Sequence, residues 1–197
     1  MTQPEHSNPP VRLSVWERLA DAAIDHFRVF RVRRTRYRHP RDRREGEFVI
    51  IEANDWVNVL ALTDDGRMLM VRQFRFGIHD FTLEIPGGVI ETGEEPVAAG
   101  LRELREETGY AGRSARLLAQ IRPNPAIQGN VCHIVLVEGC ERVGEPKLDP
   151  NEEIELSILP IDEVIARAER GEIKHSLVVD GLFFLQAWRA GRMPPAV

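Results

Sequence analysis

The sequence predicts an α+β fold in which a mixed β-sheet is sandwiched between helices, with an antiparallel β extension at the N-terminus. Strand-like segments, either alternating or wholly apolar, are interspersed with helical segments, but without the regular strand–helix–strand order of a parallel sheet. Turn residues between neighbouring strands favour hairpin connections. The 197 residues, 43% hydrophobic and 29% charged, provide for one domain with a sizeable core and a small extra element.

The N-terminal part of the chain shows three patterns. Residues 1–12 lack the basic-then-apolar order of a secretory signal, and we expect them to form a loose tail. Residues 14–24, with Ser14 as the cap, predict a short amphipathic helix. From Phe27 onward apolar and charged residues alternate, which predicts two strands around a turn at residues 39–46.

Arginines are concentrated in this hairpin, where nine occur from Arg28 to Arg44. Such a run is typical of a solvated edge hairpin, because charges discourage pairing with other strands. It is alternatively typical of a surface that helps to bind phosphates. We expect residues 13–53 to form a helix and β-hairpin extension, and residues 54–197 to form the main domain.

The main domain begins with two strands, residues 55–63 and 67–75, around the turn Asp64–Gly66. Residues 81–88 predict a strand that ends at Pro86 and opens into a glycine loop. Further strands are expected at residues 114–121, 131–140 and 154–160, and further helices at 161–170 and 177–190.

A helix over residues 96–108 is predicted by Pro96 in its first turn and Gly109 just beyond its end. Gly100 lies inside this helix, where glycine costs up to ~1 kcal/mol relative to alanine, and its small size would let a loop pack close. The stripe expected to face the core comprises Val97, Leu101, Leu104 and Thr108.

Three glutamates, Glu103, Glu106 and Glu107, crowd about one turn of this helix. Like charges at helical spacing cost roughly 0.2 to 0.5 kcal/mol per pair. The arrangement is typical of a solvated acidic face, and alternatively of a site for a hard cation such as Mg²⁺. The preceding glycine loop and further carboxylates at Glu91, Glu94 and Glu95 favour the cation site.

The spacing from Gly88 to Tyr110 is G, five residues, E, seven residues, then R-E-L-R-E-E-T-G-Y. It matches the Nudix signature G-x5-E-x7-R-E-U-x-E-E-x-G-U, where U is bulky and apolar, at every fixed position. The chain therefore resembles the Nudix hydrolases. The resemblance implies the Nudix fold and Mg²⁺- or Mn²⁺-dependent hydrolysis of a nucleoside diphosphate linked to another group.

Several catalytic roles are implied by the same resemblance. Arg102 is expected to hold the glycine loop and the helix together through an ion pair with Glu94, while Glu107 serves catalysis as a metal ligand. The implied metal ligands are Glu103, Glu106, Glu107 and the backbone carbonyl of Gly87.

The substrate is suggested by residues outside the signature. The segments VRQFR and LEIPGG resemble the ADP-ribose pyrophosphatase and nucleotide-sugar branch, in which Arg75 would contact the diphosphate and Glu84 would lie near a phosphate or the terminal ribose. Pro125 would mark a substrate loop, but it is also an ordinary loop proline. The aromatic candidates for stacking on the nucleobase are Phe48 and Trp56, each of which is alternatively a core or interface residue.

A glutamate that precedes the strand ending in Leu-Pro is the general base of the similar ADP-ribose hydrolases. Here that position is Glu152, with Glu153 as the alternative. Two acids in a polar loop are also typical of plain solvation.

Composition and resemblance together suggest the partners. A net charge of −5 argues against nucleic acid, and the apolar run from Leu177 to Trp188 is too short to cross a bilayer. Cys132 and Cys140 give no disulfide framework, so a cytoplasmic compartment is expected. The resemblance implies a homodimer, in which the N-terminal strands of one chain help to build the base pocket of the other.

Other functions remain open from the sequence. One is a Nudix hydrolase of another specificity, acting on dinucleoside polyphosphates, NADH or oxidised nucleoside triphosphates. No SQPWPFPxS-like array follows the signature, which disfavours NADH. Another is a non-catalytic module that senses ADP-ribose, although such modules tend to lose the signature carboxylates that this chain retains. An RNA-processing role would depend on the arginine run alone.

Overall fold

The computed structural model describes residues 13–193 of the chain, so the tail expected over residues 1–12 lies outside the described part. The chain divides into two compact units, Met1–Glu52 and Ala53–Val197.

The first unit contains a three-stranded antiparallel sheet of order β1-β2-β3. The hairpin predicted from the alternation is present as β2 and β3, joined by a turn in which the His39 N–H donates to the Arg44 carbonyl at 2.9 Å. The strands are β1 (Glu17–His26), β2 (Arg31–Arg38) and β3 (Glu45–Glu52).

The helix predicted over residues 14–24 is wrong, because most of this segment forms strand β1. Asp21 lies directly opposite Thr35 of β2, and its carboxylate accepts hydrogen bonds from the Thr35 hydroxyl and the Arg33 guanidinium. Thr35 is fully buried. Cross-strand hydrogen bonds to β2 therefore outweigh the weak helical preference of the local sequence.

The arginines of this sheet are engaged with carboxylates of the same sheet, which favours the solvated-hairpin interpretation over a phosphate-binding surface. Arg33, for example, contacts both Asp21 and Glu52. Further ion pairs join Arg31 to Glu52, Arg34 to Glu47, Arg36 and Arg38 to Glu45, Arg43 to Glu17 and Arg44 to Asp42.

The second unit is built on a seven-stranded mixed sheet of order β12-β5-β4-β10-β9, with β6 paired to β5 and β7 paired to β4. β4 and β10 run parallel, and the other pairs are antiparallel. The strands are β4 (Trp56–Leu62), β5 (Arg67–Arg75), β6 (Asp80–Glu84), β7 (Gly87–Val89), β9 (Ser114–Ile121), β10 (Cys132–Glu138) and β12 (Ile154–Pro160). A separate two-stranded sheet pairs β8 (Tyr110–Ala111) with β11 (Glu141–Arg142).

β4 and β5 diverge soon after the turn that joins them, with Leu62 opposite Met68 as their paired position. β6 then pairs with the second half of β5, and β7 pairs with the start of β4. Pro86, between these two short strands, accepts a hydrogen bond from the Val59 N–H at 2.7 Å. The glycine segment expected as a loop is therefore partly a strand, and it is fixed against β4.

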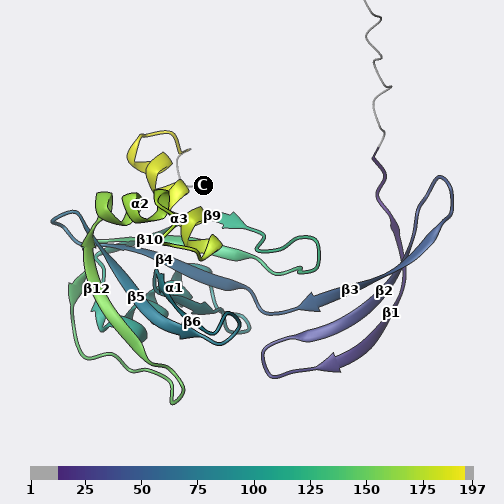
Figure 1. Ribbon diagram of the computed structural model, residues 1–197, viewed down its shortest axis with the longest axis horizontal. Helices are drawn as coiled ribbons and strands as arrows, with labels where there is room; N and C mark the ends of the chain where they lie inside the picture. The colour runs from purple at the N-terminus through teal and green to yellow at the C-terminus, as the bar shows by residue number, and fades with distance from the viewer. Residues whose placement is uncertain (1–12, 194–197) are drawn as a thin grey trace, which may run out of the picture. The chain divides into compact units, whose positions relative to one another are not determined.

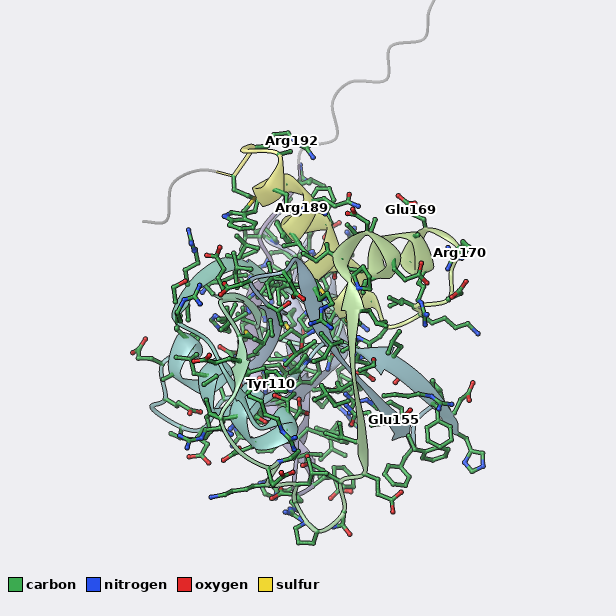
Figure 2. The ribbon with its side chains drawn as sticks, turned by 90° about the vertical axis from the view of Figure 1, so that its left-hand side faces the viewer. Tyr110, Glu155, Glu169, Arg170, Arg189 and Arg192 are labelled. Carbon is green, nitrogen blue, oxygen red and sulfur yellow. The ribbon has the colours of Figure 1, made fainter. Side chains whose placement is uncertain are left out.

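The sheet lies between helices, as predicted: α1 (Pro96–Thr108) covers one face, and α2 (Ile161–Glu169) and α3 (Ser176–Arg189) cover the other (Figure 1). Tyr110, just after α1, lies across the sheet from Glu169 and Arg189 at the ends of α2 and α3 (Figure 2). Successive residues of β4 supply two core clusters, with Val59 packed on the α1 side and Leu60 on the α2 and α3 side. Among residues 13–193, no helix is long and apolar enough to span a membrane.

Helix α1 has the predicted bounds, and Gly109 ends it with a φ of 73°. Its buried face differs from the predicted stripe, because Leu101 is 37% exposed while Gly100 is buried. A Cβ on Gly100 would lie 3.2 Å from Val57 Cγ2 and 3.3 Å from Val59 Cγ2. Gly100 thus brings the helix backbone close to the sheet rather than to a loop, and the helix is rotated accordingly.

Candidate active site

The glycine pair of β7 faces the acidic side of α1. The Gly87 N–H donates a hydrogen bond to Glu107 Oε2 at 3.0 Å. A Cβ on the next residue, Gly88, would lie 2.3 Å from Glu103 Oε1. Gly88 is needed because its backbone lies directly against the Glu103 carboxylate, whereas a Cβ on Gly87 would lie 2.3 Å from the Val57 carbonyl oxygen.

Glu107 is a buried carboxylate in an unfavourable setting for its charge. Glu107 is only 5% exposed, and burial raises the pKa of its carboxyl group to about 8. The Gly87 hydrogen bond opposes this shift, while the charges of Glu103 and Glu152 reinforce it. Burial also raises the pKa of Glu103, against the opposing effect of Arg102. The two acids therefore repel each other in a partly desolvated place, which is where a bound cation would stabilise them.

Arg102 donates hydrogen bonds to three glutamates, Glu94, Glu103 and Glu106. Its Nε and Nη2 each donate to one oxygen of Glu94 at 2.9 Å, so the ion pair expected between loop and helix is present. Its Nη1 donates to Glu103 Oε1 at 2.8 Å and to Glu106 Oε2 at 3.1 Å. A further bond to the Val89 carbonyl, at 3.1 Å, attaches the end of β7 to the helix.

A second charged pair comes from β5 and β6. Arg75 donates from Nε and Nη2 to the two oxygens of Glu84, both at 2.7 Å. Glu84 is 3% exposed; burial by itself would raise its pKa, but the hydrogen bonds from Arg75 and Thr82 bring the pKa below its ordinary value. The charges of Glu107 and Glu152 act on Arg75 as well, which links this pair to the acidic helix.

Glu152 lies in the exposed loop that precedes β12. Its Oε2 accepts the Asp149 N–H at 3.0 Å, and its own N–H donates to the Asp149 carbonyl at 2.9 Å. Its charge contributes to the raised pKa values of Glu103 and Glu107, so this loop approaches the acidic helix. Glu153 is exposed in the same loop.

Three other candidates lie in different surroundings. Phe48 belongs to the N-terminal unit, where its ring contacts Trp16 and Tyr37 edge-on at centroid distances of 5.9 and 5.7 Å. Pro125 is exposed in the segment between β9 and β10. Trp56 is partly buried against the core cluster on the α2 and α3 side of the sheet.

The residues 53–180 match the NUDIX domain. The chain belongs to the Nudix family. This identification fits the geometry, since the matched region contains the glycine pair, the acidic helix and Arg75, and it identifies the protein as a Nudix pyrophosphatase.

Relatives of this Nudix hydrolase agree with the branch indicated by its sequence. The ADP-ribose pyrophosphatase of Mycobacterium tuberculosis is 28% identical over 185 residues, covering 91% of this chain and 87% of its own. The ADP-ribose pyrophosphatase of Bacillus subtilis is 33% identical over 131 residues, with coverages of 66% and 71%. The mouse ADP-sugar pyrophosphatase is 35% identical over 118 residues, with coverages of 57% and 54%.

A solved structure, that of an ADP compounds hydrolase, superposes on this Nudix hydrolase with a TM-score of 0.82. It is 19% identical in sequence and covers 93% of this chain and 98% of its own, so it establishes the Nudix fold.

The glutamates of α1 in this Nudix hydrolase are donors suited to a divalent metal. Within residues 13–193 no three His, Cys, Asp or Glu side chains already converge as ligands. The reason is visible in the contacts: Arg102 bridges Glu103 and Glu106, and Glu107 is turned to the Gly87 N–H. The set nevertheless fits a hard cation, because it offers carboxylate oxygens against a backbone that carries no side chain.

Sequence reasoning missed one residue near the site of this Nudix hydrolase. His175, at the start of α3, places its Nε2 3.8 Å from Glu84 Oε2. No local pattern marks it, because the two residues are 91 positions apart in the sequence and meet only when α3 packs on the sheet. The pairing of Arg75 with Glu84 was also not foreseen, although both residues were named.

Proposed function

We propose that this Nudix hydrolase cleaves the pyrophosphate bond of ADP-ribose or a related nucleoside diphosphate sugar, in a metal-dependent reaction that releases a nucleoside monophosphate and a sugar phosphate. The observation that carries the proposal is the buried, mutually repelling pair Glu103 and Glu107 against the glycine backbone of β7. The names of the relatives support the substrate class.

The metal, Mg²⁺ or alternatively Mn²⁺, would be held by Glu103, Glu106, Glu107 and the carbonyl of Gly87. When bound, such an ion polarises phosphoryl oxygens and lowers the pKa of a coordinated water. Arg102 acts as a positioning residue, because it already orients Glu103 and Glu106 while it fastens the loop through Glu94.

Arg75 is the group that would bind the diphosphate. A guanidinium presents paired donors that match phosphate oxygens, and Arg75 lies within the field of Glu107 and Glu152. Glu152 would accept the proton of the attacking water while the water oxygen bonds to phosphorus and the bridging P–O bond breaks. Glu84 would hold Arg75 or the terminal ribose in place.

The remaining contacts of the substrate are proposed from the resemblance. Phe48 would stack on the nucleobase in a homodimer, and Pro125 would shape the substrate loop between β9 and β10. Exposed apolar side chains at Phe48 and Val49 of β3 and at Val29 in the turn before β2 leave apolar surface on the N-terminal unit for such an interface. The free cysteines Cys132 and Cys140 are compatible with the cytoplasmic location we propose.

One experiment tests the proposal directly. The purified protein is incubated with Mg²⁺ and a panel comprising ADP-ribose, ADP-glucose, GDP-mannose, NADH, a dinucleoside polyphosphate and nucleoside triphosphates, and the products are separated by anion-exchange chromatography. We expect rapid AMP release from ADP-ribose or ADP-glucose, which stops on chelation with EDTA. Faster turnover of the triphosphates, NADH or the dinucleoside polyphosphate would refute the proposed substrate class.

A further inference from the structure

His175 occupies an unusual position at the start of α3. Its side chain is 27% exposed, yet its Nδ1 atom is buried and has no hydrogen-bond partner among residues 13–193. Its Nε2 points to Glu84 from 3.8 Å, which is beyond hydrogen-bond distance. An unpaired buried nitrogen costs stability, so the placement of this ring calls for an explanation.

Glu84 is already supplied with three hydrogen-bond donors without His175. Both carboxylate oxygens are already held by Arg75 at 2.7 Å, and Thr82 donates to one of them. Glu84 is almost completely buried, so it depends on these donors to remain charged. While Arg75 stays on Glu84, three donors already stabilise the carboxylate, and the imidazole beside Oε2 makes no hydrogen bond to it.

The same two donors of Arg75 cannot bind both the Glu84 carboxylate and a substrate diphosphate. If its Nε and Nη2 turn to a diphosphate, Glu84 loses both of those hydrogen bonds and remains buried with Thr82 alone. A buried carboxylate that loses its partners is strongly destabilising, and this would oppose substrate binding.

We propose that His175 is a positioning residue that takes over Glu84 when Arg75 moves to the substrate. This inference depends on the proposed function, since the diphosphate is what draws Arg75 away. A closure of about 1 Å brings Nε2 to the usual hydrogen-bond distance. The free-energy cost of breaking the Arg75–Glu84 hydrogen bonds is thereby reduced, and the guanidinium becomes available to bind the substrate.

The chemistry of the imidazole fits this role. An ionised carboxylate only accepts hydrogen bonds, so Nε2 must carry the hydrogen and Nδ1 is left as a bare acceptor. The backbone of His175 is fixed, because its carbonyl accepts the N–H groups of Val178 and Val179 at the start of α3. The ring can therefore tilt toward Glu84 without moving the helix.

The first test compares His175→Leu, His175→Gln and the neighbouring control Ser176→Ala in hydrolysis of ADP-ribose with Mg²⁺. We expect H175L to lower kcat/KM roughly 10-fold, the size expected for one hydrogen bond to a charged group, while S176A is unchanged. H175Q, which keeps an N–H donor of similar reach, should recover most of the loss. Equal kcat/KM in H175L and wild type, or equal losses in H175L and H175Q, would overturn the proposal.

The second test needs no turnover and uses thermal unfolding. In wild type, H175L should shift Tm little, because Arg75 satisfies Glu84. In the Arg75→Met background, H175L should lower Tm by a further ~2 to 4 °C, corresponding to one lost interaction in a protein of this size.

The two tests separate the two claims. Additive effects of R75M and H175L on Tm would refute the handover between Arg75 and His175, whatever the substrate. If wild type does not hydrolyse ADP-ribose, the proposed function fails, and the Tm measurements still decide whether His175 supports Glu84. Should R75M or the double variant not fold, Arg75→Lys replaces R75M; lysine lacks the paired donors that hold both oxygens of Glu84, so H175L should again lower Tm more than in wild type, though by less than in R75M.

Discussion

Gly88 and Glu103 lie so close that a Cβ atom on Gly88 would be 2.3 Å from Glu103 Oε1. No side chain fits between the backbone of β7 and this carboxylate. The acidic helix and the glycine strand are thus one unit, assembled by the divergence of β4 and β5 and by Arg102. This closeness leads to a prediction that separates activity from stability.

Gly88→Ala should reduce activity without unfolding the protein. The clashing atoms belong to the end of a flexible side chain, so Glu103 can swing aside and the fold survives. A displaced catalytic group of this kind costs roughly 100-fold in rate. Steady-state kinetics and urea unfolding check the two parts, with Gly77→Ala as control, since an added Cβ there meets nothing within 4 Å. A fully active G88A enzyme would contradict the placement of Glu103.

Gly87→Ala should instead destabilise the fold. Its Cβ would lie 2.3 Å from the Val57 carbonyl oxygen, and this backbone atom belongs to the central strand β4. We expect a loss of about 1 to 3 kcal/mol in the free energy of unfolding, the usual cost of overpacking. Urea denaturation of G87A beside G88A measures it, and equal stability of the two variants would count against the tight pairing of β7 with β4.

The metal-free protein should lose stability as pH rises. Burial lifts the pKa of Glu107 from 4.5 to about 8, so the folded state favours the protonated form. The contribution of Glu107 to the free energy of unfolding is therefore fully present below pH 4.5, and it is lost as the pH rises to about 8. Urea unfolding in EDTA between pH 5 and pH 8.5 measures this slope.

Two comparisons assign the slope to Glu107. Glu107→Gln should flatten it, because the amide does not titrate, and saturating Mg²⁺ should offset it in wild type by stabilising the charged form. An unchanged slope in E107Q would show that another group is responsible.

Glu152→Gln should bind Mn²⁺ like wild type but lose most turnover, because a general base contributes typically 10²- to 10⁴-fold. Glu153→Gln is the matched control from the same loop. Measurement of kcat for both variants decides between the two residues: unchanged kcat in E152Q removes it as the base, and loss in E153Q alone transfers the role to that residue.

Arg102→Lys should cost both stability and activity. Lysine keeps the charge but cannot supply the forked donors that bind Glu94, nor reach Glu103, Glu106 and the Val89 carbonyl together. We expect about 1 to 2 kcal/mol of destabilisation for the lost hydrogen bonds. Arg105→Lys, on an exposed part of the same helix, is the control. If R102K matches it in unfolding free energy, Arg102 does not fasten the loop.

Local signals in the sequence were sufficient for several elements. Helix α1 was predicted with its observed bounds, because Pro96 and Gly109 mark its ends. β9 and β12 also have their predicted bounds. The Nudix signature grouped Glu103 and Glu107 with the glycine pair, since all of these residues lie within one short segment.

Long-range contacts account for what the sequence did not show. β1 is a strand because Asp21 bonds to Thr35 and Arg33 of the neighbouring strand. Helix α1 is rotated from its predicted orientation because Gly100 fits against valines of distant strands. His175 reaches Glu84 only through the packing of α3. Such features depend on tertiary structure that propensity and periodicity do not encode.

The central claim is that Glu103, Glu106 and Glu107 of α1 bind divalent ions. The most direct test is to titrate Mn²⁺ into the protein and to follow free Mn²⁺ by electron paramagnetic resonance. Wild type should take up Mn²⁺, and Mg²⁺ should displace it. Glu103→Gln and Glu107→Gln should each weaken binding at least ~10-fold, since losing even an outer-shell partner of a ligand typically costs about 10- to 100-fold, while Glu169→Gln, exposed at the end of α2, should not. Equal Mn²⁺ uptake by wild type and both helix variants would contradict the account.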